Sequence, residues 1–311
     1  MPFWLLLITA LMSCGGNAKQ TYQQGDELYI VTTTGMIADA LNNIAGDKAK
    51  VEAMMGTGVD PHVYKATQGD LKMLSKADII FYNGLHLEGK MADVLEKMSR
   101  QKTTVPVAEG LPQDSLLAPK EYEGAHDPHI WFDLELWAQA VDHAADHLAQ
   151  FDSTNKSYYR QNTDQYITEL QELDKWVTDK IAGIPQQQRV MITAHDAFGY
   201  FGKAYNIEVK GLQGISTVSE FGLKDVTNMV DLIVTRNIRG VFVESSVSER
   251  SLNAVVEGCN KRGHNLKIGG TLYSDAMGPK DTPTGKFLGM VRHNVNTIVS
   301  ALKGESDDQA S

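Results

Sequence analysis

The chain has 311 residues, 42% of them hydrophobic and 22% charged, a composition typical of a globular protein with about two domains. Acidic residues outnumber basic ones by 39 to 29, and the net charge of −10 argues against a nucleic-acid partner, which would require a basic surface. The same charge is compatible with a cationic ligand.

The first 14 residues are expected to be a signal peptide and not part of the fold. The apolar run Phe3–Met12 is too short to span a bilayer. It leads into Leu11-Met-Ser-Cys14, which resembles a bacterial lipobox, although no Lys or Arg precedes the run. We therefore expect lipid on Cys14, an exported protein anchored to the periplasmic or extracytoplasmic face of a membrane, and a flexible tether over residues 15–25.

Cysteine content agrees with this interpretation. The chain has two cysteines, and lipid on Cys14 would leave Cys259 alone. Neither an intramolecular disulfide nor a thiolate metal site is then expected, and Cys259 should pack as a small buried group on a helix.

Short β-branched runs alternate with helical patterns in the first half of the chain. The expected strands are 28–34, 51–55, 77–82 and 103–107. The expected helices are 35–45, 67–76, 91–100 and 134–151, and Thr67 with Asp70 has the spacing of a capping box. This alternation predicts an α/β fold with a mostly parallel sheet and helices on both of its faces.

A long helical pattern without internal Gly or Pro then predicts a linking helix over residues 153–183. About 28 residues at 1.5 Å each make a rod of roughly 40 Å, longer than one domain needs. We therefore predict an N-terminal lobe over 26–152, a C-terminal lobe over 184–303 and a disordered tail over 304–311. In the second lobe we expect strands at 190–194, 207–210, 240–244 and 266–269, and helices at 197–205, 223–236, 249–261 and 285–302.

The tripeptide Asp-Pro-His occurs twice, at Asp60–His62 and at Asp127–His129. Proline fixes its own φ and restricts the residue before it, so each imidazole stands on a defined loop. Two further polar residues follow apolar runs in the second half, and in open α/β sheets such positions line the ligand crevice. We hypothesise that four side chains converge on one divalent metal ion between the lobes: His62, His129, His195 and Asp275.

Imidazole suits Zn, Fe, Ni and Cu, while the carboxylate shifts the preference toward harder ions such as Mn. A site without a reserved open position is suited to holding a metal, whereas catalytic zinc keeps a position for water. Ligand imidazoles also need partners that orient their rings. The candidates beside the ligands in sequence are Asp60, Asp127, Asp133 and Asp196.

Each histidine also has an ordinary alternative as a surface or satisfied core residue. His143 and His147, four residues apart on an expected helix, have chelating geometry, but neighbouring acids favour a solvated polar face. His126 could assist or compete for metal, although a surface loop position is the simpler interpretation. We expect structural or exposed positions for His86, His264 and His293, and core positions for Trp131 and Trp137.

Four segments resemble the TroA-like zinc/manganese solute-binding lipoproteins of ABC importers (cluster A-I): Asp60–Tyr64, His126–Asp133, Thr193–Phe201 and Leu272–Gly278. The resemblance extends from about residue 26 to 303. It implies two α/β lobes joined by one rigid helix, small lobe movements on binding, and metal ligands at the four positions named above.

Two positions bear on the metal within that family. Members with Glu at the third ligand position lean toward manganese, whereas His195 matches the subgroup that takes zinc and manganese. Dedicated zinc members often carry a His-rich loop before the second motif, but Gln113–Ala125 contains no histidine.

We therefore expect a non-enzymatic, monomeric lipoprotein that binds one Zn(II) or Mn(II) per chain and delivers it to the permease and ATPase of an ABC importer. One alternative is a surface adhesin of the same family, which would need an exposed binding surface. Another is a zinc-dependent hydrolase, which would need an open metal position and a base such as Glu220 or Asp196. No His-Glu-x-x-His motif is present.

Overall fold

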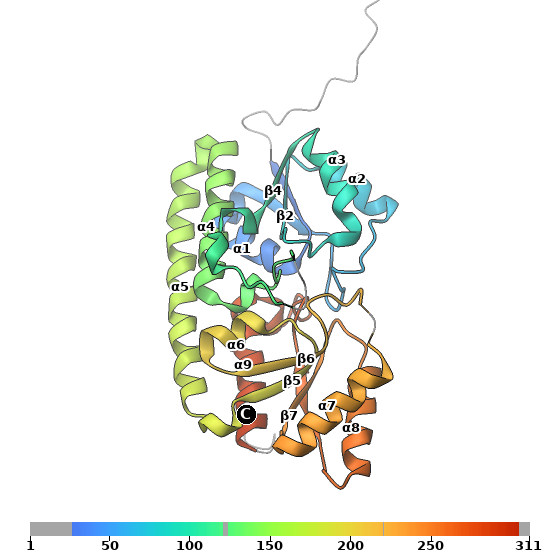
Figure 1. Ribbon diagram of the computed structural model, residues 1–311. Helices are drawn as coiled ribbons and strands as arrows, with labels where there is room; N and C mark the ends of the chain where they lie inside the picture. Colours follow the sequence, from blue (N-terminus) through green and yellow to red (C-terminus); the bar gives the residue numbers. More distant parts are fainter. Residues whose placement is uncertain (1–26, 121–123, 220, 305–311) are drawn as a thin grey trace, which may run out of the picture.

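The computed structural model describes residues 27–304, apart from 121–123 and 220 (Figure 1). The predicted signal peptide, the lipid on Cys14, the tether and the tail beyond Gly304 lie outside the described residues. In the described part, no helix combines the length and apolarity needed to cross a membrane.

The first lobe contains a four-stranded parallel sheet with the order β2-β1-β3-β4. Its strands are β1 (Leu28–Thr32), β2 (Ala49–Ala53), β3 (Ile79–Tyr82) and β4 (Thr103–Pro106). Its helices are α1 (Gly35–Ala45), α2 (Gln68–Lys76), α3 (Ala92–Ser99) and α4 (Leu134–Phe151). The expected capping box begins α2, where the Thr67 hydroxyl accepts a hydrogen bond from the Asp70 backbone N–H and the Asp70 carboxylate accepts one from Thr67.

The second lobe repeats this arrangement, with the parallel order β6-β5-β7-β8. Its strands are β5 (Val190–His195), β6 (Glu208–Gln213), β7 (Gly240–Glu244) and β8 (Ile268–Leu272). Its helices are α6 (Gly199–Tyr205), α7 (Leu223–Arg236), α8 (Arg250–Lys261) and α9 (Phe287–Lys303). The predicted fold class, two lobes each built on a parallel sheet with flanking helices, is confirmed.

Most strands differ from the prediction by one to three residues at one or both ends, and only β7 has the expected bounds. β6 extends three residues beyond the expected end at Lys210, because pairing with β5 continues to Gln213 opposite His195. β8 begins at Ile268 and not at Leu266, and its register against β7 shifts between Val241 and Val243. Gly270 in β8 has a φ of 144°, a conformation that glycine adopts freely and other residues rarely do.

Helix α5 (Lys156–Ala182, 27 residues) runs along both lobes and packs against α1 and α4 of the first lobe and α6 and α9 of the second (Figure 1). Its inward side chains are fully buried at helical spacing. They are Tyr159, Thr163, Tyr166, Leu170, Leu173, Val177 and Ile181. The largest apolar cluster is continuous from β1 and α1 through α5 to α9, so the two lobes share one core along this helix.

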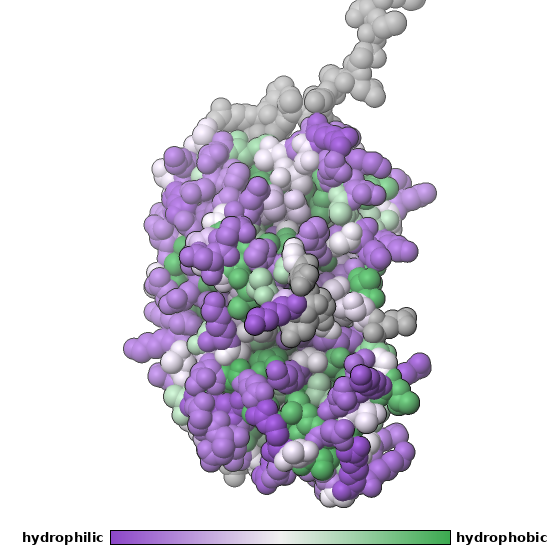
Figure 2. Space-filling model, viewed as in Figure 1, coloured by the Kyte–Doolittle hydropathy of each residue, from purple (hydrophilic) through white to green (hydrophobic). Residues whose placement is uncertain are grey.

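Smaller clusters fill the opposite faces of the two sheets. Val31, Ile80 and Leu95 lie between the first sheet and helices α2 and α3. The second sheet packs in the same way against α7 and α8, where Cys259 is fully buried as expected. Trp131 and Trp137 are also core residues. Figure 2 shows mostly polar side chains on one face of the molecule, with apolar ones scattered between them.

Replacing Leu170 by Ala should test the role of α5 in the shared core. Leu170 is fully buried in the large cluster, so its truncation should lower the free energy of unfolding by about 3 kcal/mol. Urea denaturation of the apo protein, followed by circular dichroism, measures the change. The exposed neighbour Gln171→Ala should alter stability by less than about 0.5 kcal/mol. Equal effects of the two substitutions would contradict the shared core.

Candidate metal centre

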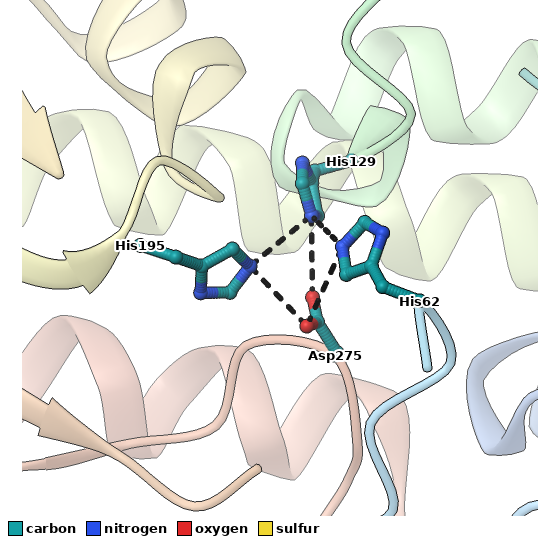
Figure 3. Close-up of side chains that lie close together, drawn as sticks. All are labelled: His62, His129, His195 and Asp275. Carbon is teal, nitrogen blue, oxygen red and sulfur yellow. Dashed lines mark hydrogen bonds and ion pairs between the residues drawn. The ribbon is translucent and has the colours of Figure 1, made fainter. Parts of the chain in front are cut away.

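Four side chains from separate parts of the chain meet between the two sheets (Figure 3). His62 stands on the loop between β2 and α2, and His129 just before the short 3-10 helix Ile130–Phe132 that leads into α4. His195 is the last residue of β5, and Asp275 lies on the loop after β8. The structure thus brings together all four residues of the predicted ligand set.

The potential ligand atoms are spaced like ligands of a single ion. Their mutual distances are all within 4.8 Å. The Nε2 atom of His129 lies 3.3 Å from Nε2 of His62 and 3.4 Å from Nε2 of His195. Asp275 places its oxygens 3.3 Å from His129 Nε2 and 3.2 Å from His195 Nε2. Two atoms that each lie about 2.1 Å from one tetrahedral ion are about 3.4 Å apart, so one metal ion fits this cluster.

The cluster is shielded from solvent. His129 and His195 are fully buried, and His62 and Asp275 are each 2% exposed. Among the described residues, the Asp275 oxygens have no partners other than the imidazole nitrogens of the cluster. A buried carboxylate without N–H or O–H donors from the surrounding protein is costly, and a cation at this position would compensate it.

Two of the three imidazoles are oriented by carboxylates behind them. His129 directs Nδ1 to Asp127 Oδ1 at 2.7 Å, and His195 directs Nδ1 to Glu244 Oε2 at 2.6 Å. The other oxygen of Glu244 accepts the backbone N–H of His195 at 2.9 Å. These contacts place the Nε2 atoms toward the centre of the cluster and increase their basicity, as in metal sites with carboxylate–histidine pairs.

His62 is held differently. Its backbone N–H donates to Asp60 Oδ1 at 2.8 Å, an Asx turn that Pro61 helps to preform. Within the described part of the chain, no carboxylate faces its Nδ1 atom. The loop backbone therefore sets the position of this ring.

The pKa values reflect the same environment. Burial lowers the pKa of His62 to about 3. Burial also disfavours charge on His129, but Asp127 and Asp275 outweigh it and raise the pKa to about 9. The pKa of His195 is raised well above its usual value because Glu244 and Asp275 outweigh its burial.

Burial favours the neutral form of Asp275, yet His195 and His129 hold its pKa well below the ordinary range. The neighbouring carboxylates thus favour a positive charge at the centre of the cluster, which a divalent cation would supply.

The prediction of which carboxylates orient the imidazole rings is only partly correct. Asp127 contacts a cluster ring as expected, whereas Asp133 accepts the Glu135 and Leu136 N–H groups as the N-cap of α4. No hydrogen bond joins Asp196 to a cluster imidazole among the described residues, and its pKa is raised to about 6 by burial and by Asp127. Sequence reasoning missed Glu244. Its position at the end of the buried strand β7, next to β5, was the available signal.

The remaining histidines lie outside the cluster. His143 and His147 contact each other with ring centroids 4.7 Å apart, on the part of α4 where Arg160 pairs with Asp142 and Asp146. His264 and His293 lie within hydrogen-bond distance of the Ile238 and Thr271 carbonyls. His126 and His86 line a separate surface pocket beside α3.

Fold and site together define a two-lobed α/β binding protein with a buried His₃Asp cluster between its lobes. The sequence profile of the family described as "zinc-uptake complex component A periplasmic" (ZnuA) matches residues 30–301. The chain belongs to this family, and the resemblance noted from its motifs is confirmed.

Individual relatives are similar over nearly the whole chain. The manganese-binding lipoprotein MntA of Bacillus subtilis is 51% identical over 296 residues, covering 94% of this chain and 95% of its own. The zinc-binding protein TroA of Treponema pallidum is 44% identical over 273 residues, 88% of each chain. The solved structure of the periplasmic zinc-binding protein TroA from Treponema pallidum superposes with a TM-score of 0.87 at 43% identity, covering 89% of this chain and 99% of that one.

Replacing Glu244 by Gln should weaken metal binding by about 10- to 100-fold, because His195 loses the carboxylate that orients its ring and increases its basicity. Competition with a chromogenic chelator measures the affinity. Asp133→Asn is a matched control, since Asn caps helices as well as Asp and this residue does not contact the cluster. An unchanged affinity of the Glu244→Gln variant would contradict the orienting role.

Proposed function

We propose that this protein binds one divalent transition-metal ion, zinc or manganese, with high affinity and delivers it to an ABC importer. The ligands in this proposal are His62, His129, His195 and Asp275. The observation that carries it is the buried Asp275 carboxylate, whose partners in the described structure are three imidazole nitrogens. Such a donor set, buried and spaced for one ion, suits capture of a metal more than reaction at it.

The proposed transport role is supported by the proteins to which the chain is related. The relatives include proteins described as manganese- or zinc-binding, and one is the manganese ABC transporter substrate-binding lipoprotein PsaA of Streptococcus mitis, at 30% identity. By analogy, the partners are a permease and an ATPase in the membrane. Anchoring through lipid on Cys14, as the lipobox-like Leu11–Cys14 suggests, would keep a monomeric carrier at the extracytoplasmic face of that membrane.

Replacing His195 by Ala tests the proposed ligand set. The variant loses one of four ligands, and its metal affinity should fall by at least about 100-fold. The rise in melting temperature on adding metal should shrink accordingly, because that rise depends on the ratio of free metal to dissociation constant. Differential scanning fluorimetry with and without zinc measures both effects.

The double variant His143→Ala/His147→Ala is the control for this experiment, since it removes two histidines that lie outside the cluster. It should bind metal like the unmodified protein. Full affinity of the His195→Ala variant, or loss of binding in the control, would contradict the assignment.

Zinc should bind more tightly than manganese. Imidazole nitrogen favours later first-row ions, and the Irving–Williams order places Zn(II) well above Mn(II), by at least about tenfold at this donor set. Competitive titration of the apo protein with both ions measures the ratio. Tighter binding of manganese would indicate that the centre expands to five or six ligands and does not keep the four-ligand arrangement.

A further inference from the structure

The loop that carries His62 makes several contacts with the opposite lobe. The Thr57 hydroxyl donates to the Gly278 carbonyl at 3.0 Å, on the loop that also carries Asp275. The backbones of the two lobes also come close at Gly58, where a Cβ atom, if one were present, would lie 3.4 Å from the Ser245 carbonyl oxygen. The Thr217 hydroxyl donates to Asp60 Oδ2 at 2.6 Å. Segments following β6, β7 and β8 therefore all approach this one loop of the first lobe.

Asp60 connects His62 to the opposite lobe, because each of its two carboxylate oxygens has a different partner. Oδ1 accepts the His62 backbone N–H at 2.8 Å, and Oδ2 accepts the Thr217 hydroxyl at 2.6 Å. One short side chain thus connects the backbone of a cluster residue to the opposite lobe. A hydrogen bond to an ionised acceptor is stronger than one between neutral groups.

The two Asp-Pro-His copies differ at this point. Asp127 uses the same turn, accepting the His129 N–H at 2.9 Å, but its Oδ1 also faces the His129 ring at 2.7 Å. Asp60 instead contacts Thr217 across the lobe boundary. His129 and His195 keep their ring orientation through carboxylates within the core, whereas His62 depends on its loop.

We propose that the Asp60–Thr217 hydrogen bond is a latch that couples closure of the lobes to the position of His62 and thereby slows release of the ion. Asp60 and Thr217 are positioning residues in this role. When the lobes separate at Thr217, Asp60 loses a donor and the turn that places His62 relaxes, so this imidazole is the first to leave the ion. This inference rests on the proposed metal-binding function.

The test is the rate at which metal leaves the protein. Zinc-loaded protein is mixed with excess chelator in a stopped-flow instrument, and the dissociation rate is compared between variants. Thr217→Val keeps the shape of the side chain but removes the hydroxyl, and it should accelerate dissociation about tenfold, equivalent to about 1.4 kcal/mol. The association rate should change by less than about twofold, since affinity differences arise mostly in dissociation.

Two variants distinguish a latch from a general loss of packing. Thr217→Ser restores the hydroxyl and should return the dissociation rate to that of the unmodified protein. Thr227→Val is the matched control, because the Thr227 hydroxyl donates to the Leu223 carbonyl of its own exposed helical turn. It should leave the rate unchanged.

A double-mutant cycle tests whether Thr217 acts through Asp60. Asp60→Ala loses both hydrogen bonds and should release zinc faster than Thr217→Val does. Adding Thr217→Val to Asp60→Ala should change nothing further. An effect of Thr217→Val that persists in the Asp60→Ala background would overturn the coupling, and an unaltered rate in Thr217→Val alone would overturn the latch.

The same experiment separates the latch from the function on which it rests. If the unmodified protein binds no zinc or manganese, the metal-binding function fails and the latch fails with it. If it binds metal tightly and Thr217→Val releases it at the same rate, only the latch is wrong.

Discussion

The packing of both lobes along α5 is the constraint on which the metal centre depends. One continuous apolar cluster runs from the first sheet through α5 to α9, so the sheets are held with the carboxyl ends of their strands facing the same gap. His62 and His129 come from one side of this gap, and His195 and Asp275 from the other. No local sequence spacing could bring them within 4.8 Å of one another. The shared core does so.

A second constraint is electrostatic. The centre buries three imidazoles together with the carboxylates of Asp275, Asp127 and Glu244. These carboxylates raise the pKa values of His129 and His195, so the centre favours positive charge. A divalent cation would contribute the same charge at a single point and would coordinate the Asp275 oxygens directly, which explains why a polar cluster of this kind persists inside an apolar core.

Much of the fold follows from local pattern. The buried strand Gly240–Glu244 and helices such as Leu223–Arg236 end where the sequence predicts, because an apolar run and helix-ending residues mark them clearly. Strand ends set by pairing are less predictable, as β6 shows: its last residues are held in the sheet by β5 and not by their own composition.

The surroundings of the site were harder to predict than the ligands. Glu244 resembles any acid that ends a strand, and only the pairing of β5 with β7 brings it to His195, 49 residues away in sequence. Asp133 was wrongly assigned because a helix N-cap and an orienting carboxylate look alike beside a histidine motif. The two Asp-Pro-His copies are identical in sequence, yet Asp60 and Asp127 have different partners that tertiary structure alone determines.

X-ray absorption spectroscopy of the zinc-loaded protein tests the central claim most directly, because it reports the atoms around the ion. The account predicts three imidazole nitrogens and one carboxylate at about 2.0–2.2 Å, without sulfur. The Asp275→Ala variant should lose the carboxylate contribution. A shell of water and carboxylate oxygens with fewer than two imidazoles would contradict the His62–His129–His195–Asp275 centre.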